Sequence, residues 1–269
     1  MTANQGHSKL VPRQSTRDIS RDSSYRRRIS RVETALFTTY NQYFETRLAV
    51  TPHLLEEAYR LRYQVYCVEN KFEDPSEHPD GLEIDAFDDH SLHSVLVHRE
   101  TGRVVGTVRL ILPLLGRTAT DLPIQTVWRG PLPFTYATAA EVSRFSISKK
   151  FRRRMTDGIY PDEKSSSRRA GQMSYDRRLQ PFIVLGLISG LVEMSAAHGI
   201  THWCTIMMPA LIRLLTRIGI HFHPLGPMVE HHGKRQPCYR NLDSLLRQVK
   251  QEKPEIWDVL TRQGTIWPP

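Results

Sequence analysis

Apolar and polar positions along the chain follow a regular order of short segments. Apolar residues alternate in some segments and recur at helical spacing in others. Two apolar runs within 91–113 are joined by a short turn that contains Gly102, which predicts a β-hairpin. The expected elements are strand 45–50, helix 51–70, hairpin 91–113, strand 139–148, helix 179–199, strand 200–209, helix 210–219, strand 220–230 and helix 241–250.

This order of strands and helices predicts a mixed α/β sheet in one domain. We expect the domain to cover residues 41–269, and residues 1–40 to form a basic, disordered tail. The tail lacks the apolar stretch of a secretory signal. It can contact RNA or an anionic membrane surface, or simply be solvated.

The segment 179–199 is almost wholly apolar, so a membrane span has to be weighed against a buried helix. Pro181, Gly186, Gly190 and Glu193 interrupt it, and it falls short of the roughly 20 apolar residues that a span needs. We therefore expect a buried central helix and no membrane span.

Composition is that of an ordinary globular protein: of 269 residues, 39% are hydrophobic and 24% are charged. The three cysteines, Cys67, Cys204 and Cys238, are scattered and form no CxxC pair. Reduced thiols and a cytoplasmic location are the expectation.

The net charge of +9 is concentrated in two segments. Residues 1–36 have a net charge of +5 and residues 149–178 have +6, so the remainder is slightly acidic. This distribution indicates an acidic partner at one place and argues against a surface coated by nucleic acid. We expect residues 149–178 to form a basic insertion in the domain.

The stretch Glu141-Val142-Ser143-Arg144-Phe145 places an acid and a base inside a strand. A surface ion pair at a sheet edge is one interpretation, and a functional pair is the other. In a regular strand, Glu141 and Ser143 share one face while Arg144 points to the opposite one. A direct pairing of Glu141 with Arg144 therefore predicts a distorted strand.

Four motifs follow one another within about residues 45–225. They fall on Arg62, Tyr66 and Phe72; on Glu83, Asp85, Phe87 and Asp88; on Arg109; and on Glu141, Ser143, Arg144 and Phe145. In this order they resemble the motifs of the acyl-homoserine-lactone synthase family. The segment "RYQVYCVENKFE" and the later "GKRQPCYRNLDSLLRQV" are closer still to the PEP-CTERM/exosortase system-associated acyltransferases, and N-acyl amino acid synthases are related. Phe72 stands where the lactone synthases carry Trp, which puts the lactone-forming amine substrate in doubt.

The resemblance implies a GNAT-like fold, with a mixed, mostly antiparallel central sheet flanked by helices. It also implies transfer of a long acyl chain from a thioester to the amine of an amino acid or related small molecule. Glu141 is expected to act as general base, with Arg144 as its charge partner. The residues expected to bind substrate are Arg62, Tyr66, Phe72, Asp85, Asp88, Arg109, Ser143 and Phe145.

The basic insertion suggests how the acyl donor is recognised. Acyl-carrier proteins are acidic, and the insertion follows the expected catalytic strand directly. Its segment 152–167, "RRRMTDGIYPDEKSSS", has one glycine and no Gly-x-Gly, which favours an acyl-carrier protein over acyl-CoA as co-substrate. The expected docking residues are Arg152, Arg153, Arg154, Arg168 and Arg169.

Other sites are less supported. His221, His223, His231 and His232 lack an acidic or cysteine ligand at a recognised spacing, so we expect neither a metal nor any other bound cofactor. Two hypotheses stay open: an N-acyltransferase, or a non-catalytic module of the same fold that binds an acyl thioester or an anionic partner.

Overall fold

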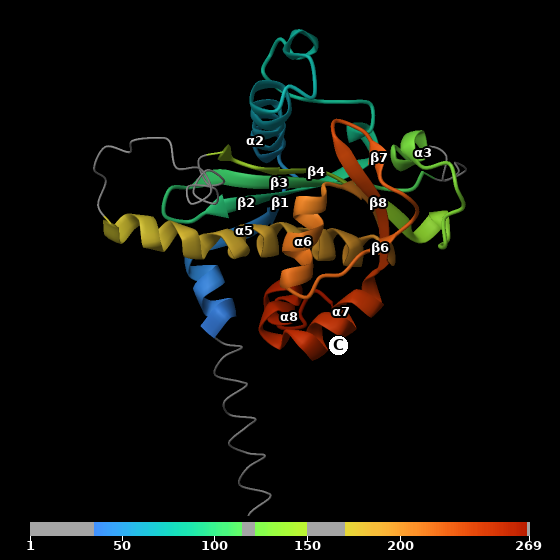
Figure 1. Ribbon diagram of the computed structural model, residues 1–269. Coiled ribbons are helices and arrows are strands. Elements are labelled where there is room, and N and C mark those ends of the chain that lie inside the picture. Colours follow the sequence, from blue (N-terminus) through green and yellow to red (C-terminus); the bar gives the residue numbers. More distant parts are fainter. Residues whose placement is uncertain (1–34, 115–121, 150–169, 268–269) are drawn as a thin grey trace, which may run out of the picture.

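A mixed sheet of eight strands organises the described part of the chain (Figure 1). The computed structural model describes residues 35–114, 122–149 and 170–267, the last range without the side chains of 170–181. The strand order is β1-β2-β3-β4-β5-β8-β6, and β7 also pairs with β8. The strands are β1 (Phe44–Leu48), β2 (Ser91–His98), β3 (Arg103–Ile111), β4 (Ala139–Ile147), β5 (His202–Met207), β6 (His223–Pro224), β7 (Val229–Glu230) and β8 (Lys234–Asn241).

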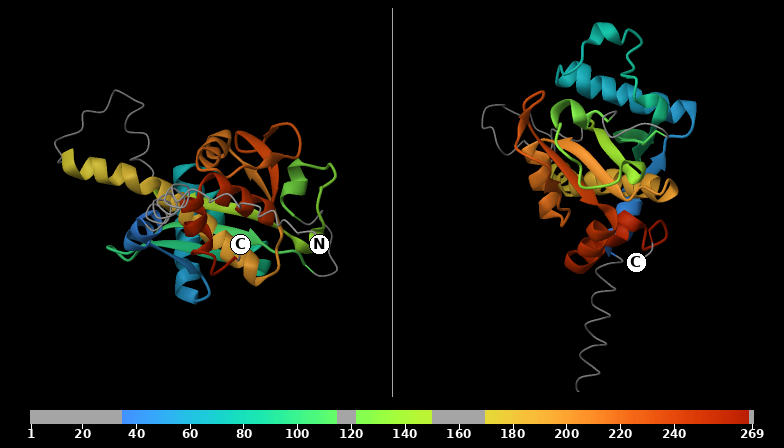
Figure 2. Two further views of the ribbon diagram at one scale, coloured as in Figure 1. Left: turned by 90° about the horizontal axis from the view of Figure 1, so that it is seen from below. Right: turned by 90° about the vertical axis from the view of Figure 1, so that its right-hand side faces the viewer.

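Helices cover both faces of this sheet (Figures 1 and 2). α2 lies on one face, and α5 crosses the other face together with α6, α7 and α8. Thr51 caps α2, since its side chain accepts a hydrogen bond from the Leu54 amide. The helices are α2 (Pro52–Tyr63) with the π-helical turn η1 (Gln64–Glu69), α3 (Ile124–Val127), α5 (Ala170–Ala197), α6 (Pro209–Arg217), α7 (Leu242–Glu252) and α8 (Pro254–Thr261).

The sheet is antiparallel at every pairing except β4 with β5, which are parallel. This confirms the predicted mixed, mostly antiparallel sheet. The β4–β5 pairing ends at Val142 and Thr205, although β4 continues to Ile147 and β5 to Met207. The two strands therefore separate beyond Val142, in the middle of the sheet.

Apolar side chains of α5 form the main core with the sheet. Leu187 and Leu191 of α5 are fully buried and pack with Leu110 and other residues of β3 and β4. Gly186 and Gly190 let the helix approach closely, because a Cβ at either position would overlap Leu96 or Ser94 of β2. Of the predicted segment 179–199, residues 182–195 of α5 are buried apart from the half-buried Glu193, in agreement with the predicted buried helix.

No helix in the described ranges is long and apolar enough to cross a bilayer.

Several predicted boundaries differ from the structure. Residues 35–43 are helical, although the tail was expected to reach residue 40; Tyr40 is buried in the core and holds this helix in place. The expected strand 220–230 consists of two short strands, β6 and β7, separated by a proline- and glycine-containing bend. α5 begins at Ala170 instead of near residue 179.

Cys67, Cys204 and Cys238 are buried and form no disulfide, as predicted.

Candidate functional site

The site is built where α2, the loop that follows it and strands β3 and β4 meet. Arg62, near the end of α2, is fully buried. Its Nε donates to Glu83 Oε2 at 2.5 Å, and its two terminal nitrogens donate to the two Asp88 oxygens at 2.7 and 2.9 Å. This bidentate pairing ties the helix to the loop before β2.

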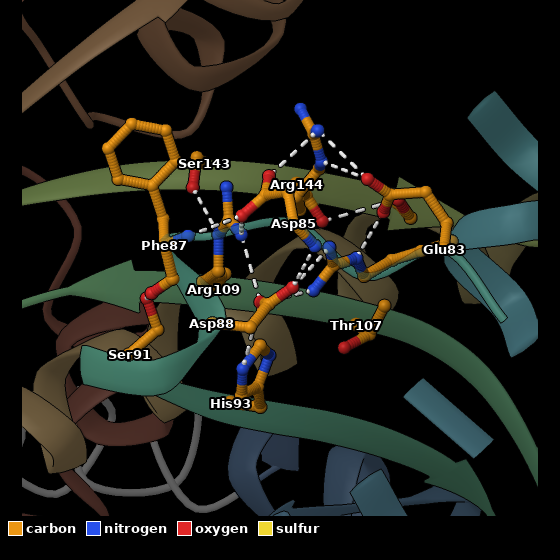
Figure 3. Close-up of polar contacts among 12 residues, drawn as sticks. Glu83, Asp85, Phe87, Asp88, Ser91, His93, Thr107, Arg109, Ser143 and Arg144 are labelled. Carbon is orange, nitrogen blue, oxygen red and sulfur yellow. Dashed lines mark hydrogen bonds and ion pairs between the residues drawn. The ribbon is translucent and has the colours of Figure 1, made fainter. Parts of the chain in front are cut away.

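Arg109 extends the network to the sheet (Figure 3). Its Nη1 donates to Asp85 Oδ1 at 2.6 Å and to Asp88 Oδ1 at 2.8 Å. Its Nε donates to the Ser143 hydroxyl of β4 at 2.9 Å. Arg109 therefore links the acidic loop to the centre of β4.

Arg144, which belongs to β4, adds a third arginine (Figure 3). Its guanidinium donates to Glu83 at 3.1 Å, to Glu73 at 3.0 Å and to Asp85 at 3.0 Å. We refer to the seven interacting residues as the charge cluster: Arg62, Arg109, Arg144, Glu73, Glu83, Asp85 and Asp88.

The strand is distorted at Arg144, as predicted. Its φ is +50°, and the β3–β4 register shifts between Thr107 and Arg109. This bulge turns the Arg144 side chain onto the face that Ser143 already occupies. The predicted partner was wrong, however, since Arg144 pairs with Glu83, Glu73 and Asp85 and not with Glu141.

The arginines keep Glu83, Asp85 and Asp88 ionised. Burial alone would raise the pKa of Asp88, but hydrogen bonds and charge from Arg62 and Arg109 hold it well below its usual value. The pKa values of Glu83 and Asp85 are lowered in the same way against burial. Removing any one arginine from such a network is costly, because it leaves carboxylates in a buried or half-buried position with fewer counter-charges.

Glu141 lies apart from the charge cluster. It is 3% exposed, and its Oε2 accepts a hydrogen bond from the Ile124 amide at 2.8 Å. In the sheet register it sits between Ile111 of β3 and Cys204 of β5, both members of an apolar cluster. Burial raises the pKa of its carboxyl to about 8. The structure therefore separates the predicted general base from the other predicted residues.

A cavity of about 140 Å³ opens where β4 and β5 separate. On the α2 side it is lined by Tyr66 and Phe72, and on the other side by α5 and α6. Since both layers contribute, the cavity passes through the sheet. The residues used below are Ser143 and Phe145 of β4, Ile188 and Leu191 of α5, and Leu211 and Leu215 of α6.

Aromatic contacts join this cavity to the charge cluster. The Arg144 guanidinium lies 4.7 Å from the centre of the Tyr66 ring, and Tyr66 meets Phe72 edge-on at 6.0 Å. Tyr66 belongs to η1, and π-helical turns are frequent at functional sites. The predicted Tyr66, Phe72, Ser143 and Phe145 thus line one cavity.

Sequence reasoning missed two residues at the charge cluster. Glu73 follows Phe72 directly and had no motif of its own to identify it. His93 is buried opposite Arg109 in the β2–β3 register, with Nε2 3.4 Å from Asp88 Oδ1. Burial and the neighbouring Arg62 lower its pKa to about 4, so it is neutral at physiological pH. A histidine in the apolar hairpin, opposite a predicted arginine, was the available signal.

The expected carrier-docking residues, Arg152, Arg153, Arg154, Arg168 and Arg169, lie outside the described residues. Within the described ranges, no group of three or more His, Cys, Asp or Glu residues is arranged to hold a metal ion.

Comparison with known proteins agrees with this architecture. Residues 61–159 match a family described as acetyltransferase (GNAT) domain. No curated protein matches the chain.

Among solved structures, the chain is similar to TofI in a ternary complex with an inhibitor and MTA, with 19% identity, 80% of this chain and 96% of TofI covered, and a TM-score of 0.56. It is similar to MesI, a CoA-dependent acyl-homoserine lactone synthase, with 22% identity, 81% and 94% coverage and a TM-score of 0.51. It is also similar to BjaI, another such synthase, solved with SAM and isopentyl-CoA, with 20% identity, 84% and 90% coverage and a TM-score of 0.51. The sheet order, the single parallel pair and these likenesses establish a GNAT-like fold.

Proposed function

We propose that the chain is an N-acyltransferase that moves an acyl group from a thioester to the amine of an amino acid or related small molecule. The observation that carries the proposal is the cavity that passes through the sheet between β4 and β5. One side is apolar and the other adjoins the charge cluster, so one passage can receive an acyl chain and a polar acceptor. The acetyltransferase-domain match over 61–159 supports the same reaction class.

The acyl chain fits the side of the cavity formed by α5 and α6. Ile188, Leu191, Leu211 and Leu215 line that side and offer no charged group to an alkyl chain. Burial of each methylene there contributes about 0.8 kcal/mol. A chain bound in this way places its thioester at the level of the sheet, beside β4.

The reaction needs an uncharged amine and a stabilised oxyanion. The amine nitrogen forms a C–N bond with the thioester carbonyl carbon, the C–S bond breaks, the thiol leaves with a proton and the amine gives one up. Beyond Val142, no described strand pairs with the edge of β4 toward β5, so backbone N–H groups there can stabilise the developing oxyanion.

The charge cluster positions this strand. Arg109 holds Ser143, and Arg144 holds the bulge against the loop that carries Glu83 and Asp85. Because each arginine contacts at least two groups, the edge of β4 is fixed before substrate binds. Preorganisation of this kind is what oxyanion stabilisation requires.

We further propose that the donor is a long-chain acyl group carried as a thioester by an acyl-carrier protein, as the basic residues after β4 suggest. MesI and BjaI are described as CoA-dependent, which makes acyl-CoA the alternative donor. Release of free thiol from each donor type, measured side by side with one acceptor mixture, decides between them.

The experiment that tests the function uses acyl donors of increasing chain length with a mixture of amino acids, and detects acyl-amine products by mass spectrometry. Leu211→Trp fills the apolar side and is expected to lower activity on the longest donor about 10-fold or more relative to short donors. Arg213→Trp, on the exposed side of the same helix, is the matched control. Donor binding without product from any acceptor would instead support a non-catalytic binding module.

A further inference from the structure

One arginine in the cavity differs from those of the charge cluster. Arg235, at the start of β8, is the only charged residue among the described residues that line the cavity. Its guanidinium carbon lies 5.4 Å from the centre of the Phe72 ring, on the side of the cavity that also holds Tyr66. Arg235 therefore faces the polar end of the passage, opposite the α5 and α6 side.

Arg235 has no acidic partner within the described ranges. Its Nε donates to the His231 carbonyl at 3.1 Å and its Nη2 to the His232 carbonyl at 3.2 Å, while Nη1 makes no hydrogen bond to a described residue. The two carbonyls fix the plane of the guanidinium without neutralising it. Burial lowers the pKa of Arg235, whereas neighbouring carboxylates raise the pKa of Arg62 and Arg144 against burial.

A held but unneutralised guanidinium in a cavity is suited to an anionic ligand. Partial burial of a cation without a counter-charge is costly, and a carboxylate offsets that cost with charge-assisted hydrogen bonds. The arginine fork matches a carboxylate in two-point geometry. Arg144 cannot take this role in the structure as it stands, because three carboxylates already occupy it.

The charge cluster supplies the complementary half of such a ligand. It contains four carboxylates and three arginines, and His93 beside it is neutral, so the cluster has one negative charge in excess. An α-amino acid has an ammonium group and a carboxylate on one carbon. Its ammonium group is attracted toward the cluster and β4, and its carboxylate toward Arg235.

Building on the acyltransfer function, we propose that Arg235 binds the free carboxylate of the acceptor, so that the acceptor is an amino acid with an unblocked carboxyl group. Amines without a carboxylate, and amino acids whose carboxyl group is an amide, are then poor acceptors. A guanidinium also binds phosphate, so a phosphate of the acyl donor is the alternative ligand. Binding of the acceptor carboxylate and binding of a donor phosphate predict different results in the experiment below.

The test compares free amino acids with their carboxamides as acceptors, using acyl-carrier and acyl-CoA donors. Wild type is expected to prefer the free acids by about 10- to 100-fold in kcat/KM, the range for a hydrogen bond to a charged group. Arg235→Gln should raise the acceptor KM and abolish that preference, while the donor KM and kcat on the carboxamide stay close to wild type. Arg235→Lys should retain part of the preference. Lys234→Gln removes the neighbouring, exposed charge and should leave the preference intact.

Three results would overturn the proposal: equal use of acids and amides by wild type, a preference that survives Arg235→Gln, or a rise in the donor KM alone. The last result would assign Arg235 to a donor phosphate.

If no acceptor is acylated, the proposed function fails, and a binding measurement with the amino acids still decides the role of Arg235. Its Nε–H signal in ¹⁵N NMR, assigned with Arg235→Gln, should shift with the free amino acid mixture and not with the carboxamide mixture. An unchanged signal would reject the role.

Discussion

The two ends of β4 hold acidic groups in opposite environments. Near its start, Glu141 lies among apolar side chains with one backbone N–H as its hydrogen-bond donor, and its pKa is raised to about 8. Three residues further along the chain, the bulge brings Arg144 against Glu83 and Asp85, whose pKa values are lowered. Glu141 and Glu83 are both buried, so neighbouring cations, not burial, decide which of them stays ionised.

The largest effect is expected from breaking the charge cluster. Arg62→Met should lower the free energy of unfolding by about 3–5 kcal/mol, because Glu83 and Asp88 stay buried with one cation fewer each, Glu83 keeping only Arg144 and Asp88 keeping only Arg109. Arg60→Met is the matched control on the same helix. Arg60 is exposed and pairs only with Glu56, so its loss should cost less than about 1 kcal/mol. Urea denaturation of both variants measures the difference, and equal losses would refute the role of the cluster in stability.

Glu141 should make the protein less stable as the pH rises. Its pKa is raised from 4.5 to about 8 on folding, so its contribution to stability is fully present below pH 4.5 and is lost as the pH rises to about 8. Over that window, the unfolding free energy of wild type should fall relative to Glu141→Gln by up to about 1.4 kcal/mol per pH unit. Denaturation of both proteins at pH 5.5 and pH 7.5 measures this, and parallel curves would contradict the raised pKa.

A smaller effect is expected at Ser143, which lies between Glu141 and Arg144 in β4. Ser143→Ala removes the acceptor for Arg109 Nε but leaves both carboxylates of that arginine in place. We expect a loss of about 1–2 kcal/mol in the free energy of unfolding. Acyl transfer should fall as well if β4 loses its position, and unchanged stability would show that the hydroxyl contributes nothing to the network.

The smallest effect is expected on catalysis by Glu141→Gln. The role of Glu141 as general base stays a prediction, and its carboxyl is buried outside the cavity-lining residues. We therefore expect kcat to fall less than about 10-fold. A loss of 100-fold or more in a stably folded variant is what removal of a general base produces, and it would restore that role.

Six of the seven residues of the charge cluster, all but Glu73, lie in the motifs of the resembled family, which singled them out one by one and not as a network. The distortion at Arg144 was predicted separately, since a regular strand points its side chain away from Glu141. The partner could not be predicted: the bulge decides whether Arg144 reaches Glu141 or Glu83, and neither distance is encoded locally.

β8 was missed for a related reason. Its first residues, from Lys234 to Pro237, are polar or proline and are typical of a loop. Pairing with β5 makes the segment a strand, and that contact spans some thirty residues of chain. Arg235 lies within this segment, so its position in the cavity was invisible from the sequence alone.

The close approach of α5 to β1 and β2 has a consequence for the choice of acyl chain. Gly186 and Gly190 set the gap between helix and sheet, and Ile188, between them in the chain, forms part of the cavity wall. A bulkier side chain at either glycine would move the helix outward and the wall with it. The width of the cavity is therefore set by two glycines that do not line it. The preference for acyl-chain length can change without any substitution among the cavity-lining residues.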